Sequence, residues 1–78
     1  MWILSQNKTE LVDVIKVSLS SVLGAKTVLI MGKFASSSLF HTNEIILGTY
    51  ASMDDAKAEL KNIQEHLNSS GTAAYEMK

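Results

Sequence analysis

The chain has 78 residues, a formal net charge of −1 and a hydrophobic share of 46%. It contains no cysteine, which excludes a disulfide framework, a thiolate metal site and a catalytic thiol. All 7 basic residues are lysine. Nucleic-acid-binding proteins commonly carry a basic excess and use arginine on phosphate and guanine, so this composition argues against DNA or RNA binding. No stretch approaches the roughly 18 apolar residues of a membrane span, and the length predicts a single domain over residues 1–78.

Four apolar segments rich in β-branched residues predict strands at 2–6, 11–19, 27–34 and 44–50. Alternation divides each of them between two faces. In the third strand, Val28, Ile30 and Phe34 share one face, while Leu29 and Met31 share the other.

The stretch MDDAKAELKNIQEHLN predicts an amphipathic helix after the fourth strand, with Ser52 as its N-cap. Its apolar stripe consists of residues spaced three and four apart, namely Met53, Ala56, Leu60, Ile63 and Leu67. The acids are expected on the solvated surface of the helix, and His66 on its polar face; these acids are Asp54, Asp55, Glu59 and Glu65. A short final strand is expected within residues 72–77, where Ala73, Tyr75 and Met77 alternate.

The order of elements is therefore β-β-β-β-α-β, an α+β domain. Consecutive strands with short connections favour a small antiparallel sheet, with the helix packed on one of its faces.

The predicted strands are apolar on both faces, although one helix can cover only one face of the sheet. A sheet with one face in water should alternate apolar and polar residues. We therefore expect a homo-oligomer that buries Leu29, Met31, Ile46 and Tyr50. The alternative is that long strands curl around the core and use both faces internally.

The segment 35–43, ASSSLFHTN, is the candidate ligand-binding loop. Hydroxyl groups, backbone amides and a neighbouring lysine can hold a phosphate, and an aromatic ring can stack on a base. The candidate residues are Lys33, Ser36, Ser37, Ser38, Phe40, His41 and Asn43. The alternative is a solvated loop in which Leu39 and Phe40 are pinned to the core.

No catalytic or metal-binding arrangement is apparent in the sequence. The two histidines, His41 and His66, have no second histidine or cysteine at a ligand spacing, so no metal is expected. Neither a paired-carboxylate site nor a glycine-rich phosphate loop is present, so we expect a protein that is not an enzyme and needs no cofactor.

The opening MWILSQNKTELVDV, the LGTY before the helix, the helix itself and the closing YEM resemble a group of very short proteins of Gram-positive bacteria and their phages. These proteins begin with Met-Trp-hydrophobic-Leu-Ser-Gln and end in an aromatic-Glu-Met segment. The resemblance spans most of the chain, and its motifs are structural, so no site residues carry over. It implies a cytoplasmic setting, which is the host cytoplasm where the protein is phage-encoded.

Small phage proteins without catalytic machinery often act stoichiometrically, and some anti-defence proteins are compact oligomers that sequester nucleotide immune signals. The leading hypothesis is accordingly a non-catalytic, oligomeric binding protein that holds a nucleotide. The alternative is an inhibitor or adaptor that docks a host protein through the apolar sheet face. A third interpretation is an accessory phage protein without a small ligand.

Overall fold

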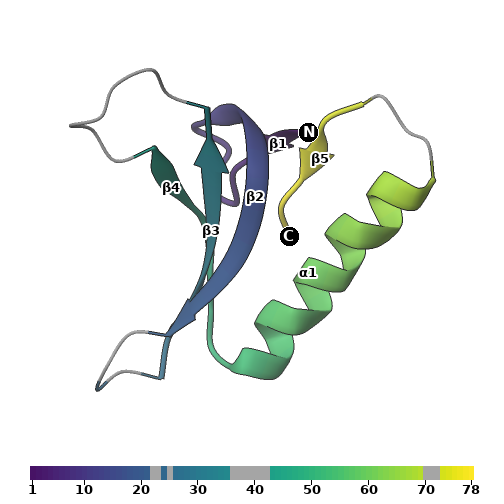
Figure 1. The fold of residues 1–78 in the computed structure, drawn as a ribbon. Coiled ribbons are helices and arrows are strands. Elements are labelled where there is room, and N and C mark those ends of the chain that lie inside the picture. Colours follow the sequence, from purple (N-terminus) through teal and green to yellow (C-terminus); the bar gives the residue numbers. More distant parts are fainter. Residues whose placement is uncertain (22–23, 25, 36–42, 70–72) are drawn as a thin grey trace.

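A computed structural model describes residues 1–21, 24, 26–35, 43–69 and 73–78. Five strands and one helix follow in the predicted order, as β1 (Trp2–Leu4), β2 (Leu11–Ser21), β3 (Val28–Phe34), β4 (Glu44–Tyr50), α1 (Met53–Asn68) and β5 (Tyr75–Glu76). The α+β class is confirmed, and α1 lies across one face of the sheet (Figure 1).

The strands form a single sheet in the order β4-β3-β2-β1-β5. The pairings among β1, β2, β3 and β4 are all antiparallel, as expected, but β5 pairs with β1 in parallel. After α1 the chain reaches the edge of the sheet opposite β4, where β5 lies beside β1 (Figure 1).

An irregularity in β2 places apolar residues from both predicted faces against one core. The register shifts between Val14, opposite Phe34, and Lys16, opposite Lys33, so Ile15 is an extra residue in the strand. An inserted residue reverses the alternation beyond it. The residues that pack in or against the core are consequently Val12 and Val14 before the shift, and Val17 and Leu19 after it.

A second irregularity has the same effect in β4. Ile30 lies opposite Gly48 and Met31 opposite Ile46, which leaves Leu47 as the extra residue. Simple alternation places Tyr50 on the side of Ile46, whereas the ring packs against the core together with Leu47. The two register shifts support the alternative that β2 and β4 bury apolar residues from both of their predicted faces in the core of one chain.

The core is built around Ile3, Ile30 and Leu47, whose side chains are all less than 2% exposed. Gly32 lies beneath this cluster on β3 and has no room for a side chain. A Cβ at residue 32 would lie 2.8 Å from Val14 Cγ1 and 2.9 Å from Leu47 Cδ1. The absence of a side chain at residue 32 therefore lets Val14 and Leu47 pack directly over β3.

Gln6 joins the end of β1 to β4, so the sheet curls back toward itself. Its backbone N–H donates to Leu47 O at 2.8 Å. Its side-chain amide accepts from Thr49 N at 2.9 Å and donates to Thr49 O at 3.3 Å. The amide also donates to Lys78 O at 3.1 Å, so this one residue connects β1, β4 and the C-terminal segment.

The helix begins where the sequence predicts, since Ser52 Oγ accepts the N–H of Asp55 at 3.1 Å. Its apolar stripe is only partly buried. Ala56 and Ile63 are buried, but Met53 is 38% exposed and Leu67 is 57% exposed. The helix is rotated toward the C-terminal segment, so the expectation of a solvated Glu59 is wrong: this side chain is 3% exposed. Among the described residues, no helix is long and apolar enough to cross a membrane.

Candidate functional site

The sheet face turned away from α1, here called the outer face, carries three cross-strand rows over β2, β3 and β4. Residues opposite each other in the register share a face and lie within side-chain contact. The rows are Ser20–Leu29–Thr49, Ser18–Met31–Ile46 and Lys16–Lys33–Glu44. The outer face therefore combines an apolar patch (Leu29, Met31 and Ile46), a border of hydroxyl groups and one charged row.

Three of the four predicted interface residues lie together in this apolar patch. Leu29 and Met31 are half-buried, and Ile46 is 53% exposed. Tyr50 lies on the inner side, where its hydroxyl donates to Lys78 O at 3.0 Å. Simple alternation placed Tyr50 on the wrong face, because the extra residue Leu47 lies between Ile46 and Tyr50.

Two of the predicted ligand-binding residues lie within the described part of the chain. Lys33 lies on the outer face opposite Lys16 and Glu44. The backbone carbonyl of Asn43 accepts the N–H of Phe34 at 2.8 Å, which closes the β3–β4 connection at its base. The other candidates, Ser36, Ser37, Ser38, Phe40 and His41, lie outside the described residues.

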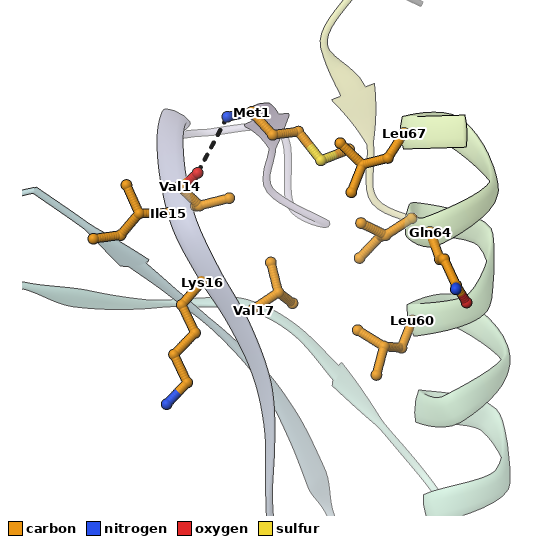
Figure 2. Close-up of a pocket in the computed structure, with 9 residues that line it drawn as sticks. Met1, Val14, Ile15, Lys16, Val17, Leu60, Gln64 and Leu67 are labelled. Carbon is orange, nitrogen blue, oxygen red and sulfur yellow. Dashed lines mark hydrogen bonds between the residues drawn. The ribbon is translucent and has the colours of Figure 1, made fainter. Parts of the chain in front are cut away.

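A groove of about 510 Å³ separates β2 from α1 on the inner side of the sheet. Its lining residues are mostly apolar, with Lys16 and Gln64 as the exceptions; the apolar ones are Met1, Val14, Ile15, Val17, Leu60, Ile63 and Leu67. In Figure 2, Met1 faces Leu67 and Val17 faces Leu60, whereas Ile15 and Lys16 point away from the helix. The sequence predicted the stripe of α1 but not this groove, because the angle between a helix and a strand is set by tertiary packing.

The buried carboxylate of Glu59 holds the C-terminal segment against α1. Its Oε2 accepts the Tyr75 hydroxyl at 3.0 Å and the N–H of Lys78 at 2.7 Å. Its Oε1 accepts from Asn62 Nδ2 at 3.0 Å. The sequence contains a signal for the burial of Glu59, since this residue lies three residues after Ala56 and four before Ile63, at the border of the apolar stripe.

His66 also contacts the C-terminal segment, so the expectation that it lies on the solvated polar face of the helix is wrong. It is half-buried, its Nε2 lies 2.8 Å from Ala73 O, and its ring meets Tyr75 edge-on with centroids 5.3 Å apart. Within the described ranges, no three His, Cys, Asp or Glu side chains are grouped to hold a metal ion.

The two tyrosines of this region have pKa values above the ordinary value of a tyrosine. Burial, and the nearby negative charge of Glu59, raise the pKa of Tyr50 to about 12. Burial and the hydrogen bond to Glu59 raise the pKa of Tyr75 above its ordinary range. An acid whose pKa is raised in the folded state favours folding while it stays protonated.

We therefore expect the free energy of unfolding to fall as the pH rises from about 10 to 12. The tyrosines of the unfolded chain ionise from about pH 10, whereas Tyr50 in the folded chain resists ionisation until about pH 12. Urea unfolding at successive pH values measures this decline. The Tyr50→Phe variant should show a shallower decline, and since the lysines titrate in both proteins, the difference in slope reports Tyr50. Equal slopes would contradict the expectation.

Comparisons with known proteins reveal no relative. No protein-family model matches the chain, no curated protein is significantly similar to it, and no solved structure matches it significantly.

Proposed function

We propose that this chain is a non-catalytic binding protein that self-associates through the outer face and holds a nucleotide beside it. The observation that carries the proposal is the apolar patch of Leu29, Met31 and Ile46, which lies on the sheet face away from α1. Burying an exposed aliphatic side chain contributes roughly 1.5–3 kcal/mol. Such a gain is large beside the stability of a domain this small, which favours a covered face.

The charged row supports an anionic ligand at the same face. Lys16 and Lys33 lie directly opposite each other, and like charges in this position destabilise a sheet. Glu44, on the other side of Lys33, offsets one of the two charges. A phosphate group between the lysines would relieve the remaining repulsion, and the row lies at the end of β3 that leads into the candidate loop 35–43.

The association half of the proposal predicts a dimer or larger species. Light scattering after size-exclusion chromatography should give at least twice the 8.5 kDa chain mass. Ile46→Lys, which places a charge in the patch, should return the chain to monomer. Leu67→Lys is the matched control, because Leu67 is 57% exposed on the helix and Ile46 is 53% exposed on the outer face. A wild-type mass of 8.5 kDa at all concentrations would contradict self-association.

The ligand half is tested separately by isothermal titration with cyclic and ADP-ribose-type nucleotides. Lys33→Gln should weaken binding by about tenfold, which corresponds to about 1.4 kcal/mol. Lys26→Gln, at an exposed lysine outside the row, should leave the affinity unchanged. A dimer that binds no nucleotide in the panel would remove the ligand half alone.

The proposal also includes a cytoplasmic location and an anti-defence role in which the protein sequesters a nucleotide immune signal.

The second candidate function is that of an inhibitor or adaptor that docks a host protein on the same patch, which the exposure of Ile46 favours equally. A monomeric wild-type protein that captures one host protein, and loses it upon Ile46→Lys, would support this candidate instead.

A further inference from the structure

The outer face carries a further cross-strand pair, on β1 and β2, beside the three rows already described. Trp2 lies opposite Asp13 in the register. Its neighbour Ile3 is buried in the core, so the alternation of a strand turns Trp2 to the other side of the sheet. Tryptophan is a highly buried residue on average, yet Trp2 is 52% exposed. An aromatic surface is therefore open to a ligand on the outer face.

The charged row follows this pair along β2. Asp13 is succeeded by Ile15, the extra residue of the strand, and by Lys16, which lies opposite Lys33. Figure 2 shows that the side chains of Ile15 and Lys16 both point away from α1. Three residues of strand cover at most about 10 Å, at about 3.3 Å per residue. A nucleoside diphosphate bridges a span of this length between its base and its phosphates.

The acids of this region leave one positive charge without a counter-charge. The carboxylate of Asp13 accepts from the Met1 ammonium group at 2.8 Å, so these two charges offset each other. Glu44 lies opposite Lys33 and offsets one of the two lysines of the charged row. Neither Lys16 nor Lys33 forms an ion pair within the described ranges, so both ammonium groups are available to a phosphate.

The order of the rows keeps such a ligand apart from the apolar patch of the outer face. Along β2 the rows follow as Trp2–Asp13, then Lys16–Lys33–Glu44, then Ser18–Met31–Ile46. A base on Trp2 therefore lies on the side of the charged row that is away from the patch. Self-association through the patch and stacking on Trp2 do not compete for the same surface.

We propose that Trp2 is the base-stacking residue of the nucleotide site, with the phosphates of the same ligand between Lys16 and Lys33. The inference rests on the proposed function, and it adds a binding residue on β1, outside the loop 35–43. Every base has a π-face, so stacking on the indole ring accepts purines and pyrimidines alike. The lysines supply charge-assisted hydrogen bonds to the phosphate oxygens. The ligand class is accordingly a nucleoside diphosphate or a derivative of one.

Trp2 is the single tryptophan of the chain, so its fluorescence reports a stacked base directly. ADP and ADP-ribose should quench this fluorescence to saturation. Inorganic pyrophosphate, which has no base, should displace ADP-ribose without quenching.

Variants at residue 2 separate stacking from apolar contact in calorimetry with ADP-ribose. Trp2→Leu keeps an apolar side chain but removes the ring, and it should weaken binding about tenfold, within the range of base–aromatic stacking. Trp2→Tyr keeps an aromatic surface and should retain most of the affinity. Leu11→Ala removes apolar area from the same face, one row farther from the lysines, and should leave the affinity unchanged.

The outcomes distinguish this inference from the proposed function. ADP-ribose binding that depends on Lys33 but is unchanged in Trp2→Leu would overturn the stacking role alone. If neither ADP nor ADP-ribose bound, the inference would be wrong, and the proposed function would survive only if a cyclic nucleotide bound. A lower mass of the ligand-free Trp2→Leu variant would overturn the inference, because a second copy would then cover Trp2. Tighter binding of a thymidine decamer than of ADP-ribose would overturn it in favour of single-stranded nucleic acid.

Discussion

Replacing Glu59 with alanine should lower the free energy of unfolding by about 3–5 kcal/mol, because three hydrogen-bond donors, one buried and two part-buried, lose their acceptor. The change leaves the Tyr75 hydroxyl, the Lys78 N–H and the Asn62 amide without their acceptor. Each buried donor left unsatisfied costs about 1–3 kcal/mol. A domain of this length has a total stability of only about 4–12 kcal/mol, so urea unfolding should show a chain that is marginally folded.

Two further variants distinguish the loss of the hydrogen bonds of Glu59 from the loss of its side-chain volume. Glu59→Gln keeps the shape and one acceptor oxygen, so it should cost less, about 1–2 kcal/mol. Glu65→Ala removes an exposed acid of the same helix and should stay within about 0.5 kcal/mol of wild type. A Glu59→Ala protein as stable as Glu65→Ala would show that the C-terminal segment does not depend on this carboxylate.

Adding a single methyl group at Gly32 should destabilise the protein by about 1–3 kcal/mol, the usual cost of overpacking. Alanine is ordinarily better than glycine within a strand by roughly 0.5–1 kcal/mol, so the sign of the effect is informative. The new Cβ would lie 2.8 Å from Val14 Cγ1 and 2.9 Å from Leu47 Cδ1, and both of those residues are buried. Thermal and urea unfolding of Gly32→Ala measure the change.

A double-mutant cycle identifies the cause of this effect. Val14→Ala removes the methyl group nearest to the new Cβ, so the double variant should be more stable than the sum of the two single changes predicts. Additive effects, or a Gly32→Ala protein more stable than wild type, would show that the core has room at this position.

The sequence predicted the parts of the fold that depend on local chemistry. The Ser52 cap, the helix from residue 53 and the element order follow from short-range patterns, and all of them are confirmed. Alternation in β3 was also predicted correctly, because β3 has buried Val28 and Ile30 on one face and half-buried Leu29 and Met31 on the other.

The remaining features depend on tertiary contacts that leave no periodic signal. Ile15 and Leu47 each shift the register by one residue, and an extra residue in a strand cannot be recognised from composition. The parallel pairing of β5, and the rotation of α1 that buries Glu59, are set by how the helix crosses the sheet. For the candidate site, alternation placed Leu29, Met31 and Ile46 on one face, as the register shows, but it also placed Tyr50 there, which is wrong because the extra residue Leu47 turns Tyr50 to the inner side.

The Gln6 side chain has a consequence for how copies of this chain can meet. An exposed strand edge offers unpaired N–H and C=O groups to other chains and promotes aggregation. The amide of Gln6 occupies both backbone groups of Thr49 on β4, and β5, at the opposite edge, has only 2 residues. Both margins of the sheet are therefore poor templates for strand addition. Because a net charge of only −1 supplies little charge repulsion, the blocked edges are the feature that would oppose fibre-like assembly, and the proposed contact between copies is expected at the faces of the sheet.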